Sequence, residues 1–195
     1  IKAILLFNKA DVNDEATQQI VKNLSALYEG IGYQCLSISA KTGENIEAVK
    51  TLMTGKSSMF AGHSGVGKST LVNTIEPGLN IKTKEISDQH NQGQHTTTFA
   101  EMFDLSFEAQ IIDTPGIKGF GVVDMEPAEI DNYFPELFIL KQSCKFNNCL
   151  HVHEPKCAVK LALENNQIAA SRYKSYTQII EGDEEHYRTD NYEPK

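Results

Sequence analysis

A glycine-rich segment before the middle of the chain constrains the fold more than any other stretch. It reads Gly62-His63-Ser64-Gly65-Val66-Gly67-Lys68-Ser69-Thr70 and fits the phosphate-loop pattern G-x-x-x-x-G-K-[ST]. The run before it, 57–61, predicts a buried strand, and residues 71–75 predict the first turns of a helix. Strand, glycine loop and helix form the context that a phosphate-binding loop needs, although the pattern alone leaves a chance glycine-rich loop as an alternative.

The residue types in this loop suit a nucleotide phosphate and its magnesium ion. The three glycines let the backbone turn its N–H groups toward phosphate oxygens, and the helix N-terminus adds partial positive charge. Lys68 is predicted to reach the β- and γ-phosphates as a catalytic residue, and the Ser69 hydroxyl to bind Mg²⁺. The candidate GTP contacts of the loop are Gly62, His63, Ser64, Gly65, Val66, Gly67, Lys68, Ser69 and Thr70.

Two short motifs at predicted strand ends suit the base of a guanine nucleotide. Asn8-Lys9-Ala10-Asp11 follows the apolar run 1–7. The Asp11 carboxylate can accept from both N1–H and the exocyclic amine of guanine, a pair that adenine does not present, while Lys9 packs its stem over the base. Ser39-Ala40-Lys41 follows the next predicted strand and can place a backbone N–H on guanine O6. Taken singly, the first motif also fits a turn and the second a helix cap.

Asp113-Thr114-Pro115-Gly116 ends another predicted strand and completes the set that a phosphate loop requires. The Asp113 carboxylate is predicted to bind Mg²⁺ through water, and the Gly116 N–H to contact the γ-phosphate.

The order of the motifs is unusual, because in ordinary GTPases the phosphate loop comes first and base recognition last. The same sheet forms if the old termini are joined between residues 41 and 62 and the chain is opened after residue 116. The sequence therefore predicts a circularly permuted domain.

Ile117 stands where many GTPases carry a glutamine that orients the attacking water. An aliphatic side chain cannot do this, so we predict that His95 in the polar loop 82–98 takes the catalytic role, with a solvent-exposed loop histidine as the alternative. Thr97 in the same loop is predicted to bind Mg²⁺ together with Ser69 and Asp113.

Apolar runs and helical spacing predict an α/β domain over residues 1–123. Strands that alternate with helices indicate a parallel sheet with its ligand loops at the carboxyl ends of the strands. The predicted strands are 1–7, 33–39, 57–61, 99–105 and 109–112, and the predicted helices are 14–29, closed by Gly30 and Gly32, and 44–53.

From about residue 124 the pattern changes to short helices. Met125-Glu126-Pro127 is predicted to begin a helix that Phe134-Pro135-Glu136 breaks, and 157–180 to hold two short helices. We therefore place a second, helical domain with an acidic tail at 124–195.

A cluster of cysteines in this second part suggests a metal centre. Cys144, Cys149, His151 and Cys157 supply three thiolates and one imidazole, a closed set typical of one structural Zn²⁺. The alternatives are reduced, unligated thiols, or His153 in place of His151. Cys35 lies in a predicted strand and is most simply a core residue.

Composition limits the partners. No run of eighteen apolar residues is present, so we expect no membrane association, and the start at Ile1 without a signal peptide suggests a fragment or a processed piece. The net charge of −8 argues against nucleic acid, whereas residues 141–174 hold six Lys or Arg and two Glu. That local surplus fits either a solvated helix face or an RNA-binding surface.

Together these motifs resemble those of the RsgA (YjeQ/YloQ) family of circularly permuted ribosome-assembly GTPases. The likeness rests on the base motifs, the phosphate loop, Gly93-Gln94-His95-Thr96-Thr97-Thr98, the stretch 113–118 and the cysteine set. It implies GTP hydrolysis to GDP and phosphate, stimulated by the small (30S) ribosomal subunit and its rRNA during late maturation, in a cytoplasmic monomer. It also implies an amino-terminal OB-fold domain, which has no counterpart in these 195 residues.

The sequence thus predicts a Mg²⁺-dependent, phosphate-loop GTPase with a zinc-binding helical domain. An alternative from another class is a non-enzymatic, zinc-stabilised RNA-binding module with a vestigial nucleotide site. A third interpretation, a phosphate-loop enzyme that acts on a small substrate or a tRNA, would need a substrate pocket for which the sequence shows no residues.

Overall fold

The computed structural model describes residues 1–63, 65–79, 101–113 and 125–181. The chain divides into two compact units, residues 1–118 and 119–195. Unit 1 carries the nucleotide motifs and unit 2 carries the cysteine cluster. The predicted boundary between residues 123 and 124 lies outside the described residues.

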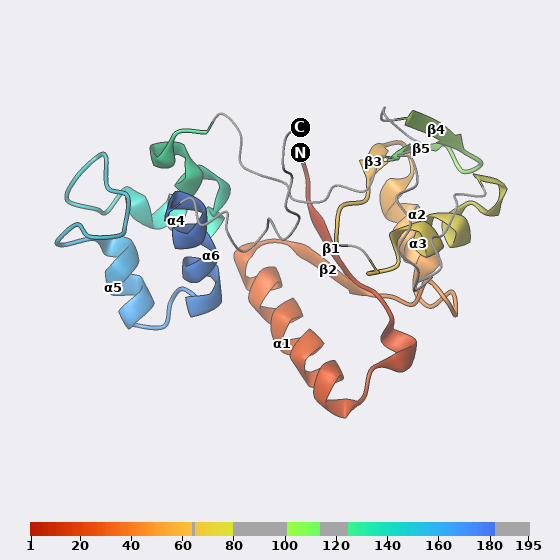
Figure 1. Ribbon diagram of the computed structural model, residues 1–195, viewed down its shortest axis with the longest axis horizontal. Coiled ribbons are helices and arrows are strands. Elements are labelled where there is room, and N and C mark those ends of the chain that lie inside the picture. The colour runs from red at the N-terminus through yellow and green to blue at the C-terminus, as the bar shows by residue number, and fades with distance from the viewer. Residues whose placement is uncertain (64, 80–100, 114–124, 182–195) are drawn as a thin grey trace, which may run out of the picture. The chain divides into compact units, whose positions relative to one another are not determined.

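Unit 1 alternates strands and helices, as the sequence predicts (Figure 1). The predicted elements of this half are present, with ends that differ by a few residues. In chain order the described elements are β1 (Ile4–Phe7), the 3₁₀ helix η1 (Ala10–Val12), α1 (Glu15–Ile31), β2 (Gln34–Ser37), α2 (Ile46–Met53), β3 (Ser57–Met59), α3 (Lys68–Ile75), the 3₁₀ helix η2 (Pro77–Leu79), β4 (Glu101–Leu105) and β5 (Ala109–Asp113).

Helix α1 shows how local chemistry sets the ends of an element. The Asp14 carboxylate accepts the Thr17 N–H at 2.8 Å and so caps the first turn. At the other end, Gly32 adopts a left-handed φ of 106°, and its N–H returns to the helix. The prediction that Gly30 also closes this helix was wrong, because Gly30 lies inside the last helical turn.

The described strands of unit 1 form two small sheets. β1 pairs with β2 in parallel, from Ile4 opposite Gln34 to Phe7 opposite Ser37. β5 pairs with β3 in parallel and with β4 in antiparallel orientation. The first sheet is parallel as predicted, and the second is mixed, because the short connection 106–108 between β4 and β5 permits only antiparallel pairing.

Strand β3 is less buried than the run 57–61 predicts. It ends at Met59, whose side chain is 48% exposed, and Ser57 is exposed as well. The reason is its place at the edge of its sheet, in the order β3-β5-β4. The prediction of a buried strand was wrong on this point.

One hydrophobic core joins the two sheets of unit 1. It contains residues from the carboxyl end of β2, from α2 and α3, and from β4 and β5. Burial of this shared apolar surface holds the loop after β2 against the helix that follows the phosphate loop. The buried members are Ile38, Ala40, Ile46, Val49, Met53, Leu71, Val72, Ile75, Leu105, Ala109 and Ile111.

Unit 2 consists of short helices around a separate core. Its described elements are the 3₁₀ helix η3 (Pro127–Tyr133), α4 (Pro135–Lys141), α5 (Ala158–Glu164) and α6 (Ala170–Glu181) (Figure 1). The two short helices predicted within 157–180 are confirmed. Pro135 ends η3 as predicted, but it also begins α4, since a first helical position needs no N–H.

A partly buried ion pair ties α6 to α4. The Arg172 Nε donates to Glu136 Oε1 at 2.7 Å, and the guanidinium lies 4.6 Å from the centre of the Phe134 ring.

Among the helices of the described residues, none combines the length and the apolarity that crossing a bilayer requires.

Candidate functional site

The two base motifs lie side by side because they follow two paired parallel strands. The ladder of β1 and β2 continues past both strands: the Ile38 N–H donates to the Phe7 carbonyl at 2.8 Å, and the Ala10 N–H donates to the Ile38 carbonyl at 3.0 Å. Asn8-Lys9-Ala10-Asp11 therefore runs directly beside Ser39-Ala40-Lys41.

A buried hydroxyl orients the Asp11 carboxylate. The Ser39 hydroxyl donates to Asp11 Oδ1 at 2.6 Å and accepts the Thr42 N–H at 3.1 Å. Ser39 is fully buried, whereas Asp11 is exposed. The carboxylate is thus anchored from beneath and faces outward, as an acceptor for the two N–H donors of a guanine must be.

The Asn8 side chain connects both base motifs to the phosphate loop. Its Oδ1 accepts the Ala40 N–H at 3.0 Å, and its Nδ2 donates to the Val66 carbonyl at 2.9 Å. Lys9, with a left-handed φ of 72°, sends its Nζ to the Gly65 carbonyl at 2.7 Å. The loops that the sequence assigns to base and phosphates are therefore in direct contact.

This contact requires glycine at position 67. A Cβ placed on Gly67 would lie 2.4 Å from Asn8 Nδ2, closer than any real contact, and the residue has a left-handed φ of 98°. The glycine therefore serves the approach of a side chain as well as the turn of the loop.

The lysine of the phosphate loop begins helix α3. Its Nζ donates to the Gly62 carbonyl and, at 2.8 Å, to the His63 carbonyl. The ammonium is thus held by carbonyls of its own loop, whereas it is predicted to reach the β- and γ-phosphates. Ser69 occupies the next position of α3 and is half-buried.

Sequence reasoning missed Thr74, which fixes the second base loop. Its hydroxyl lies 2.7 Å from the Ala40 carbonyl and 2.9 Å from the Thr70 carbonyl, so α3 reaches the loop that follows β2. No motif marks this threonine, since its role depends on how α3 packs.

Several predicted site residues have no described side chain. Ser64, His95, Thr97 and Gly116 lie outside the described residues, as does the side chain of Asp113. The backbone places Asp113 at the end of β5, whose neighbour in the ladder, β3, leads into the phosphate loop.

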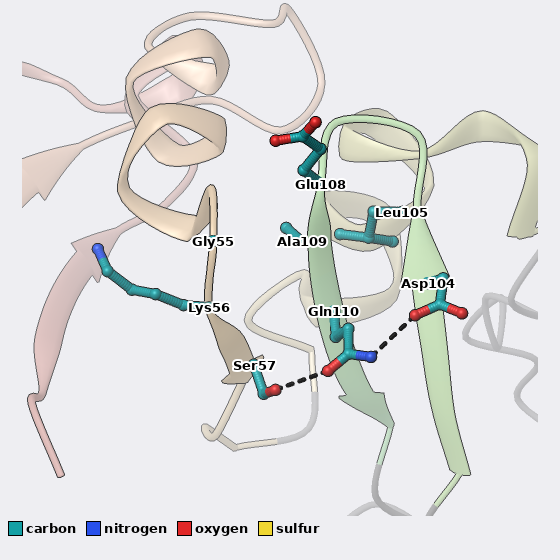
Figure 2. A pocket seen from close by; sticks show the side chains of 8 residues that line it. All are labelled: Gly55, Lys56, Ser57, Asp104, Leu105, Glu108, Ala109 and Gln110. Carbon is teal, nitrogen blue, oxygen red and sulfur yellow. Dashed lines mark hydrogen bonds between the residues drawn. The ribbon is translucent and has the colours of Figure 1, made fainter.

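A cavity of about 320 Å³ lies at the other end of these strands (Figure 2). The Ser57 hydroxyl donates to Gln110 Oε1 at 2.8 Å, and Gln110 Nε2 donates to Asp104 Oδ1 at 2.9 Å. These three polar side chains bond to one another, and the lining of the cavity includes none of the predicted site residues. The cavity is therefore separate from the nucleotide motifs.

The cysteine cluster of unit 2 forms a compact set of metal ligands. One ligand atom from each of Cys144, Cys149, His151 and Cys157 lies within 4.8 Å of the others. The Sγ atoms of Cys144 and Cys157 are 3.9 Å apart, close to the roughly 3.8 Å expected between two sulfurs of a tetrahedral Zn²⁺ site. His153 is exposed and does not join the set.

Burial keeps the thiols of Cys149 and Cys157 protonated as long as no cation is bound. Burial raises the pKa of Cys149 to about 12 and also raises the pKa of Cys157. A divalent metal offsets the cost of a buried thiolate, so binding would release the thiol protons. Three sulfurs and one nitrogen at these spacings fit Zn²⁺.

Groups outside the ligand set shape the loop around it. Glu154 accepts the backbone N–H groups of residues 150, 152 and 153, and although burial raises the pKa of this carboxyl, these bonds hold it below its usual value. The hydroxyls of Tyr173 and Tyr176 donate to the carbonyls of His151 and Leu150 at 2.7 and 2.8 Å. Nothing in the sequence marks Glu154, Tyr173 or Tyr176 as residues that fix the loop of a metal site.

Comparison with known proteins links unit 1 and the whole chain to one family. The family described as RsgA GTPase matches residues 1–123. Two proteins named small ribosomal subunit biogenesis GTPase RsgA are similar to the chain. The one from Christiangramia forsetii is 63% identical over 193 residues, covering 99% of this chain and 61% of the relative. The one from Flavobacterium johnsoniae is 64% identical over 192 residues, covering 98% and 59%.

Two solved structures share the fold. YjeQ from Thermotoga maritima aligns with a TM-score of 0.79 at 39% identity, covering 93% of this chain and 59% of that one. YloQ, described as a circularly permuted GTPase, aligns with a TM-score of 0.74 at 29% identity, covering 97% and 58%. The chain therefore spans about three fifths of the length of the proteins that it matches.

Replacing Gly67 by alanine is expected to weaken guanine-nucleotide binding at least tenfold, because the new Cβ would push Asn8 away from Val66 and Ala40. Gly32→Ala is the matched control, since Gly32 also has a left-handed φ but nothing lies within 4 Å of an added Cβ. Titration with a fluorescent GDP analogue measures the affinity. Equal affinities of the two variants would contradict the role assigned to the Asn8 contact.

Proposed function

Because the chain belongs to the RsgA GTPase family, we propose that it binds GTP and hydrolyses it to GDP and phosphate in the late maturation of the small ribosomal subunit. Its fold is the circularly permuted GTPase domain followed by a small helical unit, as the sequence predicts. The observation that carries the proposal is the Asn8 amide, which bonds to the second base loop and to the phosphate loop at once.

The base is selected by residues at the ends of β1 and β2. The Asp11 carboxylate, oriented by Ser39, accepts the two N–H donors of guanine, and Lys9 covers the base. The Ala40 N–H already donates to Asn8, so it contributes to guanine O6 only as a shared donor. Adenine offers no matching pair of donors to Asp11, so ATP is rejected.

The phosphates are bound by the loop between β3 and α3. Its backbone N–H groups and the α3 N-terminus face the phosphate oxygens, and Lys68 exchanges its carbonyl partners for the β- and γ-phosphates. Ser69, Thr97 and Asp113 are the residues that would hold Mg²⁺. When bound, this ion offsets charge that develops on the phosphate oxygens. His95 orients the attacking water, an assignment that lies outside the described residues.

One structural Zn²⁺ holds the loop of unit 2 together through Cys144, Cys149, His151 and Cys157. Four protein ligands leave no open position, so the metal organises the fold and takes no part in the hydrolysis. Two of these ligands, Cys149 and Cys157, also belong to the core of unit 2, so metal binding supplies part of the folding free energy of this unit.

Unit 2 offers a surface that suits rRNA of the small subunit. Lys145 lies 5.1 Å from the centre of the exposed Phe146 ring, which combines a cation for phosphates with an aromatic face for a base. The same observation favours the second candidate, a zinc-stabilised RNA-binding module without catalysis. In either case the protein works as a monomer in the cytoplasm, where small subunits mature.

Phosphate release from GTP tests the first candidate against the second. We expect hydrolysis that needs Mg²⁺ and rises when small ribosomal subunits are added, and a loss on the order of 100-fold or more in Lys68→Ala. Small-subunit binding that ignores GDP, GTP and a non-hydrolysable analogue, with no phosphate release by the full-length protein, would favour the RNA-binding module instead.

Replacing Asp11 by asparagine should shift the preference from guanine to xanthine nucleotides. The amide offers a donor where the carboxylate offered an acceptor, and xanthine carries a carbonyl where guanine carries its amine. The GTP affinity is expected to fall about 10- to 100-fold while XTP binding improves. Calorimetry measures both, with Asp104→Asn, an exposed carboxylate on β4, as the control. Tight ATP binding by the wild-type protein would show that the base assignment is wrong.

Removal of the metal is expected to unfold unit 2. Chelation should lower the helical circular-dichroism signal and expose residues 125–181 to protease, because the buried thiols lose the cation that offsets them. Cys149→Ser should purify without zinc, and Cys35→Ser, which changes a thiol in β2, should retain one zinc per chain by atomic absorption. A full zinc content in Cys149→Ser would contradict the assigned ligand set.

A further inference from the structure

A buried carboxylate lies against the metal centre without belonging to the four ligands. Asp131, in the 3₁₀ helix η3, is 4% exposed. Its Oδ2 lies 3.3 Å from His151 Nε2, and its Oδ1 accepts from Lys141 Nζ at 2.8 Å. Both carboxylate oxygens therefore have a partner, and one partner is a candidate metal ligand.

The two ring nitrogens of His151 face different groups. Nδ1 lies 3.3 Å from Cys157 Sγ and 3.6 Å from Cys144 Sγ, on the side of the thiols. Nε2 faces the Asp131 carboxylate instead. A neutral imidazole has one N–H and one lone pair, so this division places the proton on Nε2 and the lone pair on Nδ1.

We propose that Asp131 is a positioning residue of the metal centre, which fixes the tautomer and the ring orientation of His151 so that Nδ1 faces the metal. The proposal deepens the metal site proposed above and rests on it. The Nε2–H donates to the carboxylate, and the bond increases the electron-donating power of Nδ1 toward a cation.

The charges around the metal centre explain why Asp131 needs Lys141 as a partner. Three thiolates and one divalent cation leave a net charge of −1, and the buried carboxylate adds another negative charge next to it. Lys141 offsets that charge through its bond to Asp131, and its Nζ lies 5.1 Å from the centre of the Phe138 ring. Asp131 is thus kept beside an anionic site by a cation on α4.

The backbone conformation of His151 is a second reason why a residue outside the ligand set should fix its ring. The residue is fully buried and has a left-handed φ of 61°, a conformation that is uncommon for residues other than glycine. Tyr173 fixes its carbonyl, but of the described groups that bond to the ring, only Asp131 lies outside the ligand set. Since Asp131 is 20 residues away, η3 and the metal loop are held in one arrangement.

The test compares Asp131→Asn with Glu136→Gln in the 195-residue chain. Glu136 is a matched control, because its carboxylate is also largely buried in unit 2 and bonds to a cation, Arg172, but contacts no ligand. Competition with a chromophoric chelator gives the Zn²⁺ affinity, and the visible absorption of the Co²⁺ form reports the geometry of the ligands. Thermal unfolding of each chain at saturating Zn²⁺ gives its loss of stability.

We expect Asp131→Asn to bind Zn²⁺ about 10- to 100-fold more weakly and to change the Co²⁺ spectrum. Glu136→Gln should keep the wild-type spectrum at a comparable loss of stability, and Asp131→Glu, which keeps a carboxylate, should bind more tightly than Asp131→Asn. A wild-type spectrum and affinity in Asp131→Asn, or equal weakening in both isosteric variants, would overturn the positioning role. Failure of the wild-type chain to bind either ion would overturn the metal site itself.

Discussion

The amide of Asn8 is the interaction on which the nucleotide half of the protein depends. It spans 32 residues to Ala40 and 58 residues to Val66, and it bonds to both within 3.0 Å. Each bond contributes on the order of 1 kcal/mol, but together they set the distance between the base loops and the phosphate loop. That distance must match the length of one nucleotide. The contact therefore matters more for the geometry of the site than for the stability of the fold.

The unusual order of the motifs leaves these contacts intact. The core that joins Ile38 and Ala40 to α3 and β5 depends on which faces are apolar, and not on the direction in which the chain visits them. A chain opened at one surface loop and closed at another therefore keeps its ligand loops at the same strand ends.

The sequence was most informative where function imposes a fixed local pattern. Residue type and spacing identify the glycine loop, the base motifs and the four candidate metal ligands. In unit 1 the described base motifs contact the glycine loop, and in unit 2 the four candidate ligands lie close together. The helix ends near Asp14 and Gly32 follow from capping chemistry in the same way. At Pro135 the predicted break is present, and the same proline also begins the next helix.

Residues whose role depends on packing could not be found in this way. Thr74 and Asp131 act on loops far along the chain, and neither belongs to a spacing that indicates its partner. The exposure of β3 likewise depends on its place at the sheet edge, which an apolar count does not reveal. The sequence pattern thus predicts the function of a loop, whereas the tertiary fold determines which side chains hold that loop in place.

The tyrosines of helix α6 have a consequence for how the protein is made. Tyr173 and Tyr176 reach back 22 and 26 residues to the carbonyls of the cysteine loop. During synthesis, Cys144, Cys149, His151 and Cys157 leave the ribosome before this helix does. The cysteine loop therefore exists for a time without the two hydroxyls that fix its backbone, and its final conformation depends on the docking of α6.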